Sequence, residues 1–373
     1  MKPRLGIIGG GQLGGFICQA AQAIGVETTV LTKGPEGLAV THADALIDAG
    51  FDDLSAIDAL LAASDVITFE LEDVPVETLK KLADQDQVLI YPRPETMLLI
   101  QNKGLQKDWL VQNGFPTSDH LRFDDGLDAE AAMDRLGPDF VIKTQRGGYD
   151  GLGVKVVKGG EIPAGYEDVP TIAEALVQDF VEIAALVARD PDGNTQVFPI
   201  FESIFDESGN VVRRVACPAN VSDEIASQAA QLGCDVVNAL EGVGIFAIEY
   251  FLTRDELLVN EIAPRVHNVG HLTIEASNVS QFEQHVRAVM NMSPPSVAVS
   301  PAVMENLLYE APIATACEKS IEVSGVDGVA VHWYGKSAPR PLRKMGHLTA
   351  VADSVEQAAQ LADAAVEELK RAE

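Results

Sequence analysis

Short apolar runs alternate with amphipathic segments from Leu5 to Tyr91, and this alternation constrains the fold more than any other feature of the sequence. Leu5 to Ile8 is typical of a buried strand, Gly9 to Gly14 of a tight turn, and Gly15 to Ile24 of a helix. The pattern continues with helices and strands at residues 54–63, 66–69, 76–83 and 88–91. Strands that alternate with helices in this way build a parallel doubly wound sheet, which we expect for residues 1–94.

The turn from Gly9 to Gly14 matches the pattern G-x-G-x-x-G, whose glycines allow backbone amides and a helix N-terminus to approach phosphate. A protein that binds NAD has an acidic residue at the end of the second strand to contact the ribose, but Thr29 to Lys33 contains none. The motif therefore favours phosphate over NAD, and a turn without a ligand is the alternative.

Glu70 and Glu72 directly follow the strand at residues 66–69. Doubly wound sheets bind their ligands at the carboxyl ends of the strands. Both carboxylates are therefore candidates for a substrate contact, and solvated loop acids are the equal alternative.

A second set of candidates lies beyond residues 91–94, where the alternation ends. We expect a helix from about Glu95 to Asn113, with Lys103 and Lys107 one turn apart on one face. Lys143 ends a strand and precedes residues 146–153, which contain four glycines in eight positions. Such a loop can fold its amides over a polyphosphate and move as a lid, whereas an ordinary hairpin turn needs fewer glycines.

A hairpin later in the chain brings two carboxylates together. Residues 244–252 and 257–261 are strand-like, and the polar turn between them sets Glu249 nearly opposite Glu261. Cross-strand neighbours have Cβ atoms roughly 5 Å apart, so the two charges repel unless a dication lies between them. We therefore expect magnesium at this pair, and the alternative is that one glutamate points to solvent.

The twelve residues from Asn260 to His271 close this hairpin and contain a carboxylate, a guanidinium, two imidazoles and two amides. Such a density of polar groups indicates a functional site. Pro264 and Gly270 argue against a helix here, so we do not expect His267 and His271 to bind zinc as a helical pair.

The composition limits the possible partners. The 373 residues carry a formal net charge of −29, which argues against binding a nucleic-acid backbone. On so acidic a chain, Lys336, Arg343 and Lys344 favour a clamp for phosphate or carboxylate, with a solvated loop as the alternative. Four scattered cysteines indicate neither disulfides nor a zinc knot, and we find no signal segment or membrane span. We therefore expect a cytoplasmic enzyme without a membrane partner.

Motifs at residues 9–14, 69–72, 143–153, 260–271, 280–283, 332–336 and 343–347 resemble, in order, those of one enzyme family. This family is the 5-(carboxyamino)imidazole ribonucleotide synthetases of the ATP-grasp superfamily, which act in purine biosynthesis. The resemblance implies an α/β ATP-grasp fold that forms a homodimer. It implies four parts: a doubly wound pre-ATP-grasp domain at 1–94, linker helices and a small α+β lid domain at 95–181, a larger α+β nucleotide and magnesium domain at 182–300, and a segment at 301–373 that closes the substrate site.

The resemblance also implies a role for individual residues. The implied ATP contacts are Lys103, Lys143, Gly148, Tyr149, Asp150, Gly151, Gly153, Gln178, Val181, Glu182, Asn260 and Glu261. The implied contacts of the substrate, aminoimidazole ribonucleotide, are Gln12, Leu13, Glu70, Arg265, His267, Lys336, Arg343 and Lys344. The implied catalytic residues are Tyr149, Asp150, Arg265, His267 and Lys336, and the implied magnesium ligands are Glu249 and Glu261.

The implied reaction joins bicarbonate to the ribonucleotide through carboxyphosphate and releases ADP and phosphate. Bicarbonate is a poor nucleophile, so it must be held in line with the γ-phosphoryl group of ATP. Carboxyphosphate hydrolyses readily, so a closed lid that excludes water is required. Arg265 would bind an oxyanion through its planar guanidinium, and His267 would relay the proton that the amine loses.

The sequence departs from the family pattern near the nucleotide, at Val154, Gln178, Phe205 and Val269. These departures leave two alternatives open. One is another ATP-grasp ribonucleotide ligase, of the formate-dependent glycinamide ribonucleotide transformylase type. The other is a non-catalytic nucleotide-binding protein of the same fold.

Overall fold

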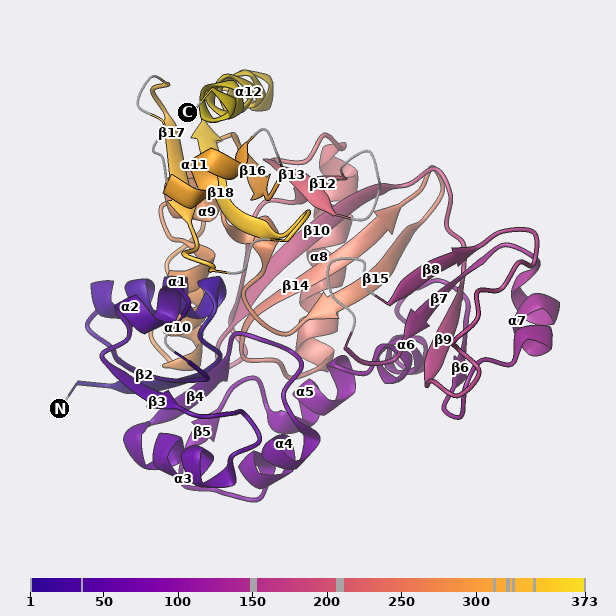
Figure 1. Ribbon diagram of the computed structural model, residues 1–373, viewed down its shortest axis with the longest axis horizontal. Coiled ribbons are helices and arrows are strands. Elements are labelled where there is room, and N and C mark those ends of the chain that lie inside the picture. Colours follow the sequence, from indigo (N-terminus) through magenta and orange to yellow (C-terminus); the bar gives the residue numbers. More distant parts are fainter. Residues whose placement is uncertain are drawn as a thin grey trace.

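The computed structural model describes residues 2–34, 36–147, 153–205, 211–310, 313–319, 323, 326–337 and 340–371. Within these residues the chain forms sheets of five, nine and four strands. Figure 1 shows the five-stranded sheet at the lower left, the nine-stranded sheet in the centre and the four-stranded sheet at the right. No helix in the described ranges is long and apolar enough to cross a membrane.

The N-terminal sheet has the parallel order β3-β2-β1-β4-β5, which confirms the predicted doubly wound unit. Its elements are β1 (Arg4–Ile8), α1 (Gln12–Ala23), β2 (Glu27–Thr32), α2 (Leu38–His42), β3 (Ala45–Asp48), α3 (Leu54–Ala63), β4 (Val66–Phe69), α4 (Val76–Ala83) and β5 (Leu89–Ile90). Leu5, Ile7 and Ile8 of the central strand are fully buried, because helices cover both faces of the sheet. The sequence did not predict the edge strand β3, because three of its four residues are exposed.

Two short helices lead out of this unit, α5 (Pro94–Ile100) and α6 (Lys103–Gln112). The prediction of one continuous helix from Glu95 to Asn113 is wrong. The side chain of Asn102 accepts a hydrogen bond from the backbone N–H of Leu105 and starts a new helix as its N-cap. This break places Lys103 in the first turn of α6.

The four-stranded sheet is antiparallel and has the order β6-β9-β7-β8. Its elements are β6 (His120–Phe123), α7 (Ala129–Leu136), β7 (Phe140–Thr144), β8 (Val154–Val157) and β9 (Thr171–Ala175). Phe140, Ile142, Val157 and Ala173 form its small core with Ala132 of α7. The sheet therefore has a core of its own beside the larger sheet.

The nine-stranded sheet is antiparallel along the path β15-β14-β10-β12-β13-β16-β18-β17, and β11 pairs with β10. Its strands are β10 (Val181–Arg189), β11 (Thr195–Val197), β12 (Phe201–Phe205), β13 (Val212–Cys217), β14 (Gly244–Leu252), β15 (Leu257–Ala263), β16 (Ala302–Leu308), β17 (Val329–Trp333) and β18 (Lys344–Val351). Its helices are α8 (Asp223–Ala239), the 3-10 turn η1 (Asn268–Gly270), α9 (Thr273–Ala276), α10 (Gln281–Val289), α11 (Ala314–Lys319) and α12 (Val355–Lys370). Because β13 pairs with β16, the domain boundary expected at residue 300 falls within one continuous sheet.

Alternate residues of β10 face two different cores. Ala184 and Leu186 pack in the core that contains Phe282 of α10, whereas Ile183 and Ala185 pack in the core that contains α8. This alternation is the period-2 pattern of a strand that is buried on both faces. The sheet is thereby fixed as a rigid support for the polar side chains at one end of β10, β14 and β15.

Candidate active site

The β14–β15 hairpin brings the two predicted metal ligands together. Glu249 pairs with Glu261 in the antiparallel register, as predicted. Burial raises the pKa of Glu249 to about 7, and the carboxylate of Glu261 adds to this shift. The pKa of Glu182, on the adjacent β10, is also raised, first by burial and then by Glu249. These three carboxylates therefore concentrate negative charge at one end of the sheet.

Lys103 and Lys143 approach the carboxylates from the helix α6 and the strand β7. The ammonium group of Lys103 forms an ion pair with Glu261, and Lys143 Nζ lies 3.3 Å from Oδ1 of Asn260. Although burial opposes the shift, these two ammonium groups lower the pKa of Glu261. The structure thus brings together the predicted nucleotide contacts Lys103, Lys143, Asn260 and Glu261.

Glu174 of β9 was not predicted, although it fixes two of the lysines. Its carboxylate lies 2.8 Å from Lys143 Nζ and 3.2 Å from Lys107 Nζ. Although burial opposes the shift, these two ammonium groups lower the pKa of Glu174, while burial lowers the pKa of Lys107 to about 8. The signal in the sequence was a glutamate within an apolar strand, because a buried carboxylate needs a cationic partner.

A cavity of about 410 Å³, which we call the hairpin cavity, lies between the two antiparallel sheets. Its lining includes Lys143, Glu182, Glu249, Asn260 and Glu261, and also Phe205. The cavity therefore combines a charged wall with apolar surface, as expected for a site that takes a nucleotide.

Gln178 and Val181, the expected ATP contacts in this segment, are not among the residues that line the hairpin cavity, and both are exposed. Residues 174–177 line it in their place. Asp179, which has a φ of 50°, forms a turn in this segment, and Phe180 and Glu182 line the cavity again beyond it.

Most of the predicted lid, namely Gly148, Tyr149, Asp150 and Gly151, lies outside the described residues. Gly153, at its far end, has a φ of 80°, and its carbonyl oxygen accepts a hydrogen bond of 3.1 Å from the N–H of Thr144. This bond closes the hairpin between β7 and β8. The loop that joins them therefore starts beside Lys143.

A second cavity, of about 610 Å³, lies beside the N-terminal glycine loop, and we call it the glycine-loop cavity. Its lining includes the predicted substrate contacts Gln12, Leu13, Glu70, Arg265, His267 and Lys344. The two cavities share Glu72, Lys103, Glu261, Arg265, His267, Asn268 and Lys344. Because they share these walls, the two cavities adjoin, and the hairpin and the loop after it form their junction.

Glu70 occupies the amides that the sequence assigned to phosphate. Its two carboxylate oxygens accept hydrogen bonds of 2.7 Å from the N–H groups of Gly11 and Gly14. Gly14 is required here, because a Cβ atom would lie 2.6 Å from the carbonyl oxygen of Gly9. The phosphate interpretation of the glycine motif is therefore corrected: the anion at these amides is a side chain of the protein. Burial raises the pKa of Glu70 although both amides oppose this shift.

Arg265 is fixed by Glu72, with 2.8 Å between Nη2 and Oε1. Burial raises the pKa of Glu72 although the guanidinium opposes this shift. The Nε atom of Arg265 is buried and has no hydrogen-bond partner within the described part of the chain. Arg265 therefore retains an unused donor.

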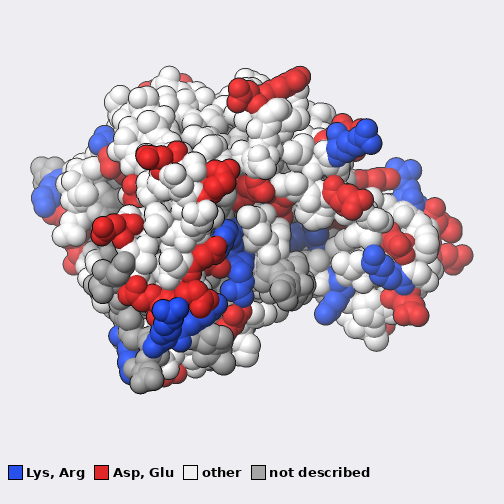
Figure 2. Space-filling view, turned by 90° about the horizontal axis from the view of Figure 1, so that it is seen from above, with Lys and Arg blue, Asp and Glu red and all other residues white. Residues whose placement is uncertain are grey.

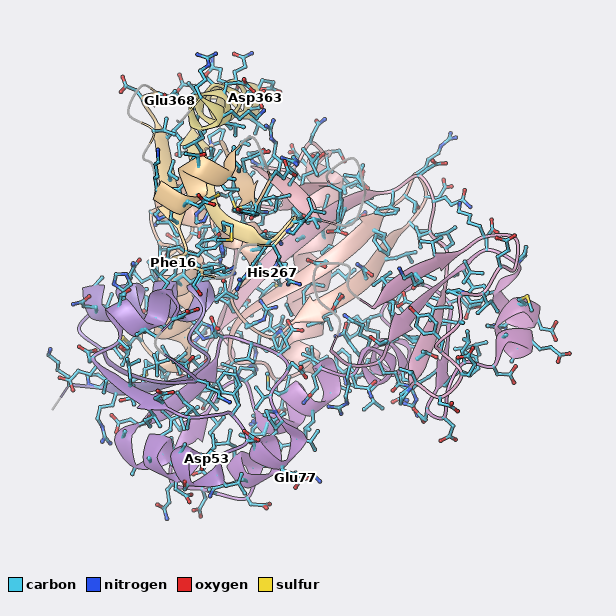
Figure 3. The ribbon with its side chains drawn as sticks, in the orientation of Figure 1. Phe16, Asp53, Glu77, His267, Asp363 and Glu368 are labelled. Atoms are coloured by element: carbon cyan, nitrogen blue, oxygen red, sulfur yellow. The ribbon has the colours of Figure 1, made fainter. Side chains whose placement is uncertain are left out.

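Hydrogen bonds between Gln281 and the backbone of His267 fix the position of this residue. The side-chain oxygen of Gln281 accepts a hydrogen bond of 2.9 Å from the N–H of His267, and its amide nitrogen donates one of 2.6 Å to the carbonyl oxygen. The Nε2 atom of His267 lies 3.5 Å from Oε1 of Glu249, and burial lowers the pKa of the imidazole well below its ordinary value. Figure 3 shows His267 near the centre of the molecule. A neutral imidazole at the junction of the cavities can accept a proton.

The predicted cations near the C-terminus divide into two groups. Lys344 lines both cavities, and its carbonyl oxygen accepts a hydrogen bond of 2.7 Å from Lys336 Nζ. Lys336 Nζ also lies 4.9 Å from the ring centroid of Tyr334. Neither Lys336 nor Arg343 is among the residues that line either cavity. Figure 2 shows a hollow between the main body and the four-stranded unit, with Lys and Arg side chains on its walls.

Three family models match successive parts of the chain. They are the ribonucleotide synthetase preATP-grasp domain at residues 1–101, the ATP-grasp domain at 108–282, and the phosphoribosylaminoimidazole carboxylase C-terminal domain at 302–361. Together they confirm the predicted ATP-grasp fold with its N-terminal pre-ATP-grasp domain.

Individual relatives match over nearly the whole chain. The N5-carboxyaminoimidazole ribonucleotide synthase of Brucella melitensis is 36% identical over 364 residues, which cover 94% of this chain and 97% of the relative. The phosphoribosylaminoimidazole carboxylase of Ogataea methanolica is also 36% identical, but the match covers 67% of that longer protein and 94% of this chain.

Solved structures agree with these relatives. The N5-carboxyaminoimidazole ribonucleotide synthetase of Thermotoga maritima has a TM-score of 0.84 at 38% identity, with coverage of 99% of this chain and 98% of that one. The carboxyaminoimidazole ribonucleotide synthase of Aspergillus clavatus, solved with ATP, has a TM-score of 0.90 at 30% identity, with coverage of 100% and 99%. This chain therefore belongs to the N5-carboxyaminoimidazole ribonucleotide synthase family of ATP-grasp enzymes.

Proposed function

We propose that this protein catalyses the ATP-dependent carboxylation of 5-aminoimidazole ribonucleotide by bicarbonate, forming the 5-carboxyamino product, ADP and phosphate. The observation that carries this proposal is that two cavities adjoin at Glu261, Arg265 and His267. ATP in the hairpin cavity and the ribonucleotide in the glycine-loop cavity would present their reacting groups to each other there. The Aspergillus clavatus relative, solved with ADP and 5-aminoimidazole ribonucleotide, supports this pair of ligands.

Magnesium is part of this proposal, with Glu249 and Glu261 as the residues that would hold it. Carboxylate oxygens are the hard ligands that Mg²⁺ prefers, and the pKa of Glu249 is raised by burial and then by the facing carboxylate of Glu261, whose charge a dication would offset. When bound, the ion neutralises charge on the phosphates of ATP. Lys103 and Lys143 bind and orient the same phosphates.

Arg265 and His267 act at the junction of the two cavities. Arg265, oriented by Glu72, presents a planar guanidinium that holds bicarbonate in line with the γ-phosphoryl group. Burial keeps His267 neutral, so its imidazole can accept the proton that the amine loses when the carbon–nitrogen bond forms. Lys336 and Lys344 would bind the phosphate of the ribonucleotide. We also propose that the enzyme works as a cytoplasmic homodimer, as the family resemblance implies.

The release of ADP from ATP in the presence of magnesium and bicarbonate tests the function directly. We expect release to depend on 5-aminoimidazole ribonucleotide, with one carboxylated product for each ADP. Formate in place of bicarbonate, with glycinamide ribonucleotide as the acceptor, should give no product. Turnover with formate would indicate the transformylase reaction, and binding of ATP without any ADP release would indicate a non-catalytic protein. Either result contradicts the proposal.

A further inference from the structure

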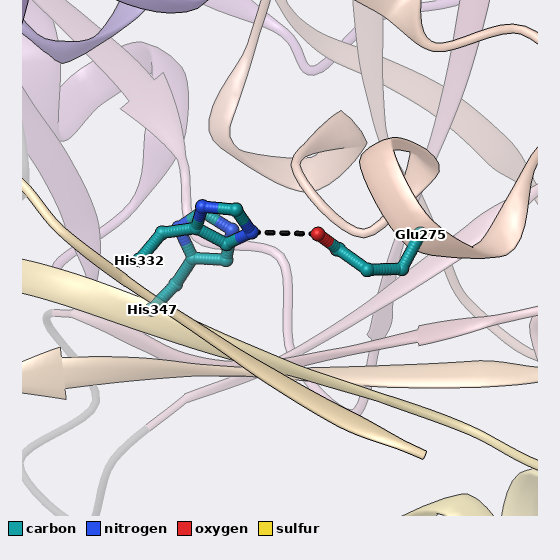
Figure 4. A group of neighbouring side chains, drawn as sticks. All are labelled: Glu275, His332 and His347. Atoms are coloured by element: carbon teal, nitrogen blue, oxygen red, sulfur yellow. Dashed lines mark hydrogen bonds and ion pairs between the residues drawn. The ribbon is translucent and has the colours of Figure 1, made fainter. Parts of the chain in front are cut away.

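A group of polar side chains away from the two cavities lies where three segments meet. Glu275 belongs to α9, His332 to β17 and His347 to β18. One possible ligand atom from each lies within 4.8 Å of the other two. We call these three residues the histidine cluster, and Figure 4 shows them side by side.

The contacts of the histidine cluster orient its nitrogen atoms. Nε2 of His332 lies 2.6 Å from Oε1 of Glu275, and the His332 and His347 rings stack with centroids 4.7 Å apart. The hydroxyl of Tyr334 lies 2.8 Å from Nδ1 of His347. If Nδ1 of His347 donates to Tyr334, the lone pair of Nε2 is free, and a partner of this kind orients a metal-binding histidine.

Buried atoms in the histidine cluster have no partner. Nε2 of His347 and Oε2 of Glu275 are buried and form no hydrogen bond within the described ranges. Nε2 of His271 is also buried and has no hydrogen-bond partner among these residues, and the centroid of the His271 ring lies 4.8 Å from that of His347. Buried polar atoms are almost always paired, so several unpaired atoms in one place indicate a missing ligand.

The histidine cluster is also accessible to an ion from solvent. The side chains of His332 and Glu275 are 27% and 21% exposed, whereas His347 is fully buried behind them. An ion that enters past His332 and Glu275 therefore reaches Nε2 of His347, which has no hydrogen-bond partner among the described residues.

We propose that the histidine cluster binds one zinc-class transition-metal dication through Nε2 of His332, Nε2 of His347 and a carboxylate oxygen of Glu275. Two imidazoles and one carboxylate are a ligand set that holds zinc, with water in the fourth position. Mg²⁺ prefers oxygen ligands in an octahedral arrangement, so the magnesium that accompanies ATP would not compete well here. The ion replaces the hydrogen bond between His332 and Glu275: the ring proton of a neutral His332 moves from Nε2 to Nδ1, and the lone pair of Nε2 then binds the metal.

The bound ion would join parts of the chain that are far apart in the sequence. It would connect α9, which follows the loop that carries His267, to the C-terminal strands β17 and β18. Phe16 of α1 already packs edge-on against the rings of His332 and His347, with centroids 5.6 Å and 5.9 Å away. The ion would therefore strengthen the junction of the N-terminal and C-terminal units, and this inference does not depend on the proposed carboxylation.

Titration of the metal-free full-length protein with Co²⁺, in the presence of excess Mg²⁺, tests the site. We expect one equivalent of Co²⁺ to give the visible ligand-field absorption of an ion with a low coordination number. One equivalent of Zn²⁺ should displace Co²⁺ and abolish this absorption. Glu275→Gln and His332→Gln should each weaken Co²⁺ binding by at least about 10-fold, and Tyr334→Phe by about 10-fold through loss of the second contact of His347. Zn²⁺ should raise the thermal unfolding temperature of the unmodified protein but not of Glu275→Gln.

His42→Gln is the matched control, since His42 is a histidine outside the cluster whose Nε2 lies 2.8 Å from the side-chain nitrogen of Gln19. It should bind Co²⁺ as tightly as the unmodified protein. Circular dichroism verifies that each variant is folded, and the partly exposed Glu275 and His332 give the decisive variants if changes at His347 prevent folding. Absence of the absorption from the unmodified protein overturns the proposal, and so does undiminished absorption in both Glu275→Gln and His332→Gln.

Discussion

The acidic side chains in the two adjoining cavities have different partners. In the glycine-loop cavity, Glu70 is bound by two backbone amides and Glu72 by Arg265, so each carboxylate has its partner within the protein. Burial raises the pKa of carboxylates in both cavities, but for Glu182 and Glu249 in the hairpin cavity the next largest effect comes from a neighbouring carboxylate and adds to the rise. The first pair of carboxylates has its partners within the protein, whereas the second pair would gain a partner from the proposed magnesium ion. The two cavities therefore differ in how much of their negative charge the protein itself pairs.

The largest effect should follow a change in the hairpin cavity. Glu261→Gln removes a carboxylate that faces Glu249 and leaves Lys103 without its ion-pair partner. We expect kcat for ADP release to fall by on the order of 10²- to 10³-fold, because charge stabilisation of the transition state is lost.

Glu77→Gln serves as the control for this experiment. Glu77 lies on α4, away from His267 in Figure 3, and its side chain is 76% exposed. Its substitution should leave kcat unchanged. If Glu261→Gln retains most of its activity, the assignment of the metal ligands is wrong.

A change at the ion pair of the glycine-loop cavity should affect stability as well as activity. Arg265→Met leaves Glu72 without its partner, so we expect a loss of about 3 kcal/mol in the free energy of unfolding and of about 100-fold in activity. Adding Glu72→Gln to this variant should restore most of the stability but not the activity. Denaturant unfolding and ADP release measure the two effects. Recovery of activity in the double variant would show that Arg265 acts only through folding.

The pH dependence of the free energy of unfolding tests the raised pKa of Glu249. The pKa of Glu249 is raised to about 7 in the folded protein, so between its ordinary range and neutral pH the folded state binds the extra proton. Stability relative to Glu249→Gln should therefore fall as pH rises from 5 to 8, by on the order of 1–3 kcal/mol. The buried histidines change the free energy of unfolding in the opposite direction as pH rises. Both proteins contain these histidines, so the comparison with Glu249→Gln cancels their contribution. Excess Mg²⁺ should remove this decline, and an unchanged decline would contradict metal binding at Glu249.

The smallest effect should follow a change in the support of His267. Gln281→Leu removes both hydrogen bonds to the His267 backbone, and we expect kcat to fall about 10-fold while KM for ATP changes little. Gln284→Leu is a matched control, because Gln284 is equally buried on α10 but donates to the carbonyl oxygen of Pro295. It should destabilise the protein without changing kcat in the folded enzyme. Equal losses of kcat in both variants would show that Gln281 has no specific positioning role.

Local patterns in the sequence predicted the structural features that depend on residues close together in the chain. The register of Glu249 and Glu261 followed from one turn, and the doubly wound sheet followed from strands and helices of ordinary length. The break at Asn102 was missed, although its signal was local too, because a capping residue stood within the expected helix.

Pairings between distant residues could not be predicted in this way. The pairing of β13 with β16 joins segments that the sequence assigned to different domains, and no turn connects them. The contacts of Glu174 with Lys107 and Lys143 likewise depend on how α6, β7 and β9 pack. The sequence therefore singled out side chains that the structure brings together at the two cavities, but not the contacts that orient them.

The carboxylate of Glu70 is a covalently tethered competitor at the amides of Gly11 and Gly14. Glu70 and the glycine loop are held close together by the fold, so the effective concentration of this carboxylate at the amides is high. A dissolved anion would have to displace a side chain that cannot diffuse away. Shortening this side chain would leave both amides without their acceptor and open to a small oxyanion.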